Sequence, residues 1–149
     1  MKTFNTIAAL LPAAVLGAAV PRAAEYSVTD FSAACIAHST YCALNFNVTT
    51  SAGAPTVTCS FFGPGPDYLP AIPLSGCSDP SVSFSFAPAA DKSAFPLTVV
   101  SAAGPGTNLT GTYVIPGADV TLDNNGAVVD ERYIGGAEFV ITDLTTIPA

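Results

Sequence analysis

The side chains that could carry out chemistry in this chain are few, and the first of them is its single histidine, His38. Any Ser–His–Asp or Cys–His site would have to include this imidazole. Cys35 and Cys42 bracket it, and if they form a disulfide neither can supply a thiolate nucleophile. No serine stands in a G-x-S-x-G turn. We therefore expect His38 to be an ordinary loop residue, and we predict no catalytic residues and no enzymatic activity.

Carboxylates are the second candidate chemistry, either as an acid–base pair for glycoside hydrolysis or as calcium ligands. We expect the acidic residues at hairpins and strand ends, and the chain has no tryptophan to serve as a sugar platform. One Asp/Asn cluster lacks the D-x-D-x-D-G spacing of an EF-hand and suits the backbone hydrogen bonds of a tight turn. We therefore predict no metal site and no cofactor. The cluster comprises Asp119, Asp123, Asn124, Asn125 and Asp130.

The four cysteines favour disulfides over a zinc site. The chain has no C-x-x-C motif, and one histidine is too few to complete a set of zinc ligands. Cysteine counting alone leaves three pairings open. We favour Cys35–Cys42 and Cys59–Cys77, because each pair would close one local connection between neighbouring strands. Each bond would then contribute about 2–3 kcal/mol by restricting the unfolded chain.

The N-terminus predicts secretion. Lys2 precedes an apolar stretch from Ile7 to Val20, and the small residues Gly17 and Ala19 suit a signal-peptidase site. The stretch has about 14 residues, fewer than the roughly 20 that span a bilayer. We predict a signal peptide at residues 1–19 and a secreted, extracellular domain at residues 20–149.

The composition predicts one globular domain with an acidic surface. Half of the residues are hydrophobic, 10% are charged, and the net charge is −7. Such a chain can bury a real core. An acidic surface with few lysines has no attraction for nucleic acid or anionic lipid, so we expect neither partner.

Apolar residues alternate with polar ones in most segments, which is typical of antiparallel strands with one buried face. In Tyr41–Thr49, for example, Leu44, Phe46 and Val48 point one way and Asn47 points the other. We predict an all-β fold, a single antiparallel β-barrel or β-sandwich with two disulfides. The expected strands are Tyr26–Phe31, Tyr41–Thr49, Thr56–Phe61, Ser81–Phe86, Phe95–Ser101, Thr110–Ile115, Val120–Leu122, Ala127–Tyr133 and Phe139–Leu144.

Several local features complete this prediction. Asn125-Gly126 indicates a tight hairpin, and the Pro/Gly-rich stretch from residue 63 to residue 73 indicates a surface loop. Residues 32–35 could form at most one helical turn. The side chains expected in the core are Leu44, Phe46, Val57, Phe61, Val82, Phe84, Phe86, Val114, Val128 and Phe139.

Two sequons, Asn47-Val-Thr and Asn108-Leu-Thr, are candidate glycosylation sites in a secreted chain. Asn47 is expected on the polar face of its strand, opposite Phe46 and Val48. Asn108 is expected in a loop, after Gly104-Pro-Gly-Thr107.

Four short motifs between residues 26 and 100 resemble the Alternaria alternata allergen 1 family of secreted fungal proteins. They are Val28-Thr-Asp-Phe31, Leu44-Asn-Phe-Asn-Val48, Val57-Thr-Cys-Ser60 and Ser75-Gly-Cys-Ser-Asp-Pro-Ser-Val-Ser-Phe-Ser-Phe86. The resemblance implies one antiparallel β-barrel or sandwich, and it places Cys59 and Cys77 at the family's central disulfide. The chain has no counterpart of the family's C-terminal cysteine pair or of the cysteine that links two subunits. Covalent dimerisation is therefore not expected.

The resemblance implies contact with plant defence proteins or binding of plant phenolics, and the family offers no catalytic motif to transfer. Our leading hypothesis is a secreted, non-enzymatic interaction protein, effector-, elicitor- or allergen-like, whose partner is a host or cell-wall protein. The alternative is an extracellular carrier of small phenolic ligands. A secreted hydrolase with a diffuse site and a wall-associated structural protein rank below both. A closed apolar cavity would favour the carrier, and a filled core with an exposed apolar patch would favour a protein partner.

Overall fold

The computed structural model describes residues 24–124 and 126–149, which form eleven β-strands and one short 3-10 helix, η1 (Gly117–Asp119). All strand pairs are antiparallel. The predicted signal peptide and its cleavage site lie outside the described residues. Within them, no helix has the length and apolar character to cross a membrane.

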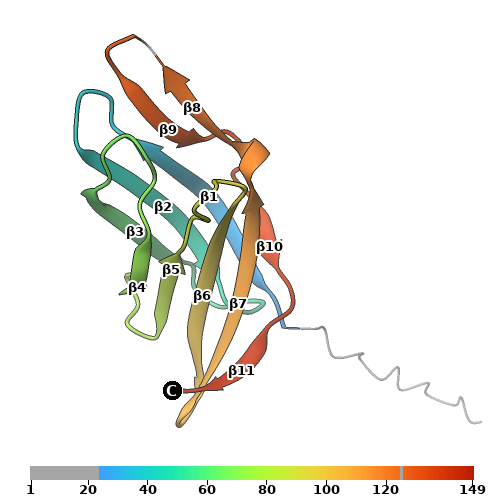
Figure 1. Ribbon diagram of the computed structural model, residues 1–149. Coiled ribbons are helices and arrows are strands. Elements are labelled where there is room, and N and C mark those ends of the chain that lie inside the picture. The colour runs from blue at the N-terminus through green and yellow to red at the C-terminus, as the bar shows by residue number, and fades with distance from the viewer. Residues whose placement is uncertain (1–23, 125) are drawn as a thin grey trace, which may run out of the picture.

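The strands form two sheets (Figure 1). The first has the order β3-β2-β1-β9-β8, with β10 also paired to β1, and the second has the order β11-β7-β6-β5-β4. The first sheet comprises β1 (Tyr26–Cys35), β2 (Tyr41–Thr49), β3 (Val57–Pro64), β8 (Val120–Asn124), β9 (Val129–Tyr133) and β10 (Phe139–Ile141). The second comprises β4 (Ile72–Gly76), β5 (Val82–Phe86), β6 (Ala94–Gly104), β7 (Thr107–Pro116) and β11 (Thr145–Pro148).

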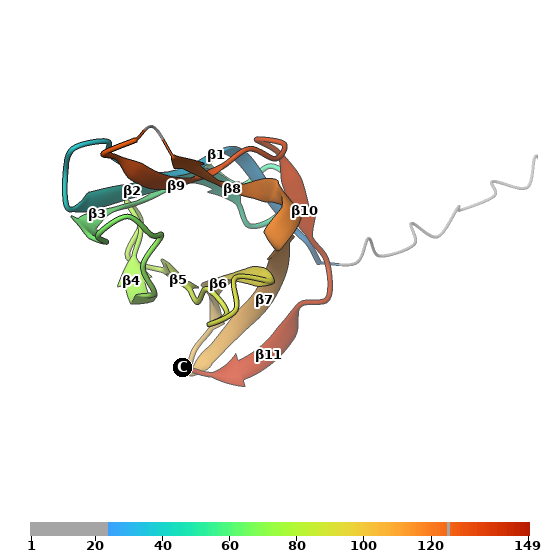
Figure 2. The same cartoon turned by 45° about the horizontal axis from the view of Figure 1, so that its top comes forward.

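The predicted all-β antiparallel fold is confirmed. Among the described strands, pairing closes neither sheet into a barrel. The two sheets face each other across the interior, and the C-terminal segment passes from β10 in the first sheet to β11 in the second (Figure 2).

One aromatic-rich core fills the space between the sheets. Phe46 of β2 meets Phe84 of β5 edge to face, with ring centroids 5.2 Å apart. Tyr26 of β1 is fully buried, and its hydroxyl lies 2.8 Å from Ser101 Oγ and donates to the Leu109 carbonyl oxygen at 2.8 Å. Burial raises the pKa of this phenol above its ordinary value. Both contacts tie the first sheet to the second.

The period-two pattern placed most core side chains correctly. Six of the expected ten are buried: Leu44, Phe46, Val57, Val82, Phe84 and Phe86. Phe61, Phe139 and Val128 are half-buried, and the first two pack against the core.

The prediction for Val114 is wrong, because its side chain is 54% exposed. Tyr113, Val114 and Ile115 form an unbroken apolar run, so the sequence alone does not say which residues of the strand face inward. The structure buries Ile115 and packs Tyr113 against the core. Val114 therefore faces outward.

Other corrections concern strand limits. β1 continues to Cys35, so no helical turn forms at residues 32–35. The register with β2 shifts between Thr29 and Ser32, around Asp30, whose φ is +54°. This bulge allows the strand to continue past its polar interruption. The strands β4 and β11 were not predicted, because both are short and proline-containing.

Both favoured cysteine pairs are disulfides in the structure. Cys35 and Cys42 lie opposite each other at the adjoining ends of β1 and β2. Cys59 lies in β3, at the edge of the first sheet, and Cys77 directly follows β4, at the edge of the second. The second disulfide therefore joins the two sheets.

The fold predicts a large difference between Phe84→Ala and Val114→Ala. Removing the fully buried Phe84 ring should lower the free energy of unfolding by about 3–5 kcal/mol, since it leaves a cavity between the sheets. Val114→Ala should change it by less than about 0.5 kcal/mol, because the side chain already contacts water. Urea denaturation followed by circular dichroism measures both. Equal losses would contradict the assigned faces of β5 and β7.

Candidate functional site

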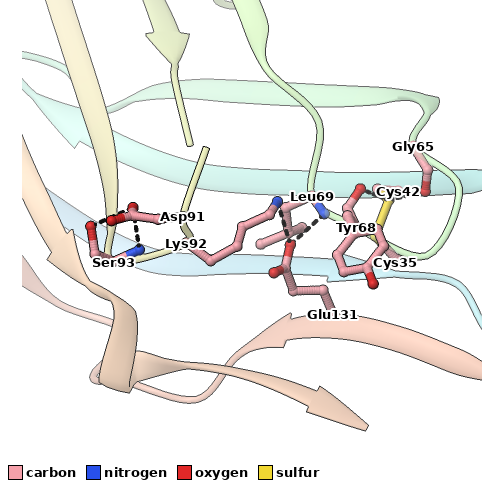
Figure 3. Close-up of polar contacts among 9 residues, drawn as sticks. All are labelled: Cys35, Cys42, Gly65, Tyr68, Leu69, Asp91, Lys92, Ser93 and Glu131. Carbon is pink, nitrogen blue, oxygen red and sulfur yellow. Dashed lines mark hydrogen bonds and ion pairs between the residues drawn. A yellow bond between two sulfur atoms is a disulfide. The ribbon is translucent and has the colours of Figure 1, made fainter. Parts of the chain in front are cut away.

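The most unusual polar group in the described residues is the carboxylate of Glu131, which is 4% exposed in β9. Its Oε2 accepts a hydrogen bond from the backbone N–H of Leu69 at 2.7 Å and lies 3.4 Å from Lys92 Nζ (Figure 3). The backbone N–H of Glu131 donates to the Asp67 carbonyl oxygen at 3.0 Å. Glu131 thus fastens the loop between β3 and β4 to β9.

Lys92 reaches Glu131 from the connection between β5 and β6. Its Nζ lies 5.1 Å from the centre of the Tyr68 ring and 5.7 Å from the centre of the Phe95 ring, which are cation–π distances. The residue has φ +60°, a left-handed conformation stabilised by a local turn. In that turn Asp91 Oδ1 accepts hydrogen bonds from the Ser93 hydroxyl at 2.6 Å and the Ser93 N–H at 3.1 Å.

The Cys35–Cys42 disulfide lies beside the same loop. Gly65 packs so closely that a Cβ there would come within 2.6 Å of Cys42 Sγ and 2.8 Å of Pro70 Cδ. Only glycine fits this approach. The predicted surface loop is therefore held by Gly65 on the disulfide, by Leu69 on Glu131 and by Tyr68 under Lys92 (Figure 3). The hydrogen bond of the Asp67 carbonyl oxygen to Glu131 adds a fourth contact.

His38 is exposed in the connection between β1 and β2 and has φ +60°. It lines an open hollow of about 250 Å³ together with Asp67, whose φ is +66°. The hollow also contacts the end of the β8–β9 hairpin at Val128. Both neighbouring cysteines are oxidised, so the hollow offers an imidazole and a carboxylate but no thiolate.

The two sequons lie in strands. Asn47 is half-buried on the outer face of β2, opposite Phe46 and Val48 as expected. Its Nδ2 donates to Asp30 Oδ2 at 2.9 Å, and its Oδ1 accepts from the Thr58 hydroxyl at 2.9 Å. The loop predicted for Asn108 is wrong, since it is half-buried in β7 between Ala102 of β6 and Ile147 of β11. Glycosylation of both remains a prediction.

Of the Asp/Asn cluster considered for calcium, Asn125 lies outside the described residues and Asp119 is the last residue of η1. The other members lie in the β8–β9 hairpin, where Asn124 pairs with Val129 and Asn124 Oδ1 accepts from the Gly126 N–H at 3.2 Å. Asp123 is an ion-pair partner of Arg132. One carboxylate oxygen of Asp130 is buried without a hydrogen-bond partner among the described residues. No group of three or more His, Cys, Asp or Glu side chains with metal-binding geometry occurs in residues 24–124 and 126–149.

Sequence reasoning missed an exposed aromatic pair on the outer face of the first sheet. Phe62 of β3 is 67% exposed and stacks on Tyr41 of β2, with ring centroids 5.2 Å apart and planes 11° apart. The signal was present in the sequence, because consecutive residues of a strand face opposite sides and Phe61 was already assigned inward. Phe62 therefore had to point outward.

The Glu131–Lys92 pair predicts a measurable contribution to stability. Lys92→Met keeps an apolar stem against Tyr68 and Phe95 but leaves the buried carboxylate with one partner fewer, so unfolding should become easier by about 1–3 kcal/mol. Arg132→Met is the matched control, because its pair with Asp123 is exposed and should contribute less than about 1 kcal/mol. Urea denaturation measures both. A smaller effect for Lys92→Met than for Arg132→Met would contradict this account.

A second prediction concerns pH. The hydrogen bonds from the Ser93 hydroxyl and N–H lower the pKa of Asp91 below its ordinary value of 3.8. A lowered folded-state pKa contributes stability that is present above the unfolded-state pKa and is lost as pH falls through the folded-state pKa. The stability advantage of wild type over Asp91→Asn should therefore be largest above about pH 4 and shrink at more acidic pH. Urea titrations between pH 2 and pH 7 measure it, and a pH-independent difference would contradict the assignment.

No protein-family model matches the chain, and no curated protein matches it significantly in sequence. Two crystal structures of the Alternaria alternata allergen Alt a 1 match in fold. One has a TM-score of 0.53 and 20% identity, with 84% of this chain and 95% of the allergen chain covered. The other has a TM-score of 0.54 and 20% identity, with 91% and 98% covered. The two-sheet architecture assembled around the core is therefore the fold of Alt a 1.

Proposed function

We propose that this chain is a secreted, non-enzymatic interaction protein of the extracellular space, allergen-like in fold and effector- or elicitor-like in action. Its partner in this proposal is a host or cell-wall protein. The fold of Alt a 1, two disulfides and an acidic surface all support an extracellular protein.

The observation that carries the proposal is the contrast between a filled interior and an exposed aromatic surface. Phe46, Phe84 and their neighbours occupy the space between the sheets with rings in direct contact. Phe62 and Tyr41 stack on each other in solvent. Exposed aromatic side chains are enriched where proteins contact proteins, because they bury a large area at little cost in conformational entropy.

The candidate chemical groups also support a non-enzymatic role. His38 is exposed and stands beside oxidised cysteines. The buried carboxylate of Glu131 is engaged by a loop amide and a lysine, in an arrangement that fixes the loop. A catalytic group needs a reacting atom within reach, whereas both Glu131 partners belong to the chain itself.

One observation favours the alternative, a carrier of small phenolic ligands. An open hollow of about 430 Å³ lies where the start of β1 and the end of β2 meet Leu109 of β7. Its volume is within the range of small-molecule sites, roughly 300–1,000 Å³. It is open rather than closed, so it excludes water less completely than a barrel interior would.

The proposal predicts that biological activity does not require the imidazole. His38→Asn removes it and tolerates the left-handed backbone better than alanine would, so stability should change by less than about 0.5 kcal/mol. The purified residues 20–149 and this variant should give equal responses in a leaf-infiltration assay and no turnover on a hydrolase substrate panel.

Two outcomes would contradict the proposal. Turnover by wild type that His38→Asn abolishes would identify an enzyme. Saturable phenol binding that Leu109→Lys abolishes, with no response in the leaf, would identify a carrier instead.

A further inference from the structure

We infer that the open hollow beside Asp67 binds an arginine side chain of the partner protein, with the Asp67 carboxylate as the acceptor for the guanidinium. This inference rests on the proposed interaction function and gives its partner a chemistry. The hollow has a volume of about 250 Å³, below the roughly 300–1,000 Å³ of sites for drug-sized ligands. It therefore suits one inserted side chain better than a whole small molecule.

Three segments form the walls of the hollow, and all of them lie at one end of the molecule (Figure 1). The connection between β1 and β2 contributes Ile36 and Thr40, the loop between β3 and β4 contributes Asp67, and the β8–β9 hairpin contributes Val128. The walls thus place one carboxylate beside apolar and hydroxyl-bearing side chains.

The walls are fastened to one another, so the hollow exists before a ligand arrives. The Gly65 N–H donates to the Thr40 carbonyl oxygen at 2.9 Å, which joins the two loops. The Glu131 N–H donates to the Asp67 carbonyl oxygen at 3.0 Å, which joins the second loop to β9. The first loop is itself closed by a disulfide. A ligand would therefore bind without first ordering these segments, and this lowers the entropic cost of binding.

The Asp67 carboxylate has no cationic partner in the part of the chain that the structure describes. The only lysine and arginine there are Lys92 and Arg132, which pair with Glu131 and Asp123. No ion pair joins Asp67 to a histidine among the same residues. A cation for this exposed carboxylate must therefore come from outside the described chain.

The polar side chains of the hollow select a ligand that is rich in hydrogen-bond donors. The ionised carboxylate of Asp67 only accepts hydrogen bonds, and the hydroxyl of Thr40 can accept as well. No lysine or arginine lines the hollow to attract an anion. The net charge of −7 also favours the approach of a cation over that of an anion.

The apolar wall favours arginine over lysine. Ile36 is 43% exposed and Val128 is half-buried, so both can be covered by the methylene stem of an entering side chain. A planar guanidinium can then donate two parallel hydrogen bonds to one carboxylate, which an ammonium cannot do. The guanidinium is also more weakly hydrated than an ammonium, so it loses less when it is placed beside apolar side chains.

The test uses the disulfide-bonded protein of residues 20–149 and a blocked arginine, Nα-acetyl-arginine N-methylamide, as the probe. A titration at low salt should give saturable NMR shifts of the Thr40, Asp67 and Val128 amides, with a dissociation constant on the order of 1–10 mM. The citrulline analogue has nearly the same shape but no charge, and it should bind at least about tenfold more weakly. The lysine analogue should bind at least about threefold more weakly.

The variant Asp67→Asn locates the site. Asparagine keeps the size of the side chain and tolerates the left-handed φ of +66°, and it leaves the carbonyl oxygen that accepts from Glu131 in place. Because it removes the charge, it should weaken binding of the arginine probe by at least about tenfold. Asp143→Asn is the matched control. It removes the same charge from an exposed position after β10, which pairs with the opposite end of β1, and should leave binding within about twofold. Circular dichroism confirms folding of both variants.

Equal binding of the citrulline analogue, or equal binding by Asp67→Asn and wild type, would overturn the inference. Equal or tighter binding of the lysine analogue would overturn the assignment to arginine. The leaf-infiltration assay separates this result from the broader proposal. A wild-type response without arginine binding removes only the site in the hollow, and arginine binding without any response removes the proposed function.

Discussion

The structure depends on fastening two open sheets to each other. Because neither sheet closes on itself in the described residues, backbone pairing alone does not hold one against the other. Aromatic packing between Phe46 and Phe84 supplies the interior contact, and the Tyr26 hydroxyl adds a polar link from β1 to the second sheet. The Cys59–Cys77 disulfide closes one side covalently. The loop between β3 and β4 is then held by its hydrogen bonds to Glu131.

Glu131 shows how a chain with few lysine and arginine residues can bury a carboxylate in its fold. The carboxylate is compensated by one backbone N–H and by one of the chain's four Lys and Arg residues, itself oriented by two aromatic rings and the Asp91–Ser93 turn. Burying such a group is costly unless its partners are fixed. The contacts of Leu69 and Asp67 with Glu131, and of Tyr68 with Lys92, give a stretch rich in proline and glycine a defined conformation directly after β3 in the chain.

Much of the fold could be predicted from alternation alone, and the failures have physical causes. Strands with a clear polar face, such as β2 and β5, were placed with the correct side chains inward. The prediction for Val114 failed because Tyr113, Val114 and Ile115 are all apolar, so the sequence does not show which of them face the core. The loop predicted for Asn108 was wrong because Gly104-Pro-Gly was taken as part of a long loop. In the structure the pairing of β6 with β7 extends as far as Gly104 and Thr107, so Asn108 lies within a strand. The Glu131–Lys92 contact joins segments 39 residues apart, and no local pattern encodes such a pair.

The placement of β1 has a consequence for how the chain acquires its structure. β1 is central in the first sheet, yet it pairs with β9 and β10, which come from the last quarter of the sequence. Of the pairings that β1 makes, only the hairpin to β2 can form before β9 and β10 have been added to the chain. Non-local pairing of this kind gives a high contact order and slow folding. A chain delivered N-terminus first must therefore wait for its final segment before its first strand is covered on both sides.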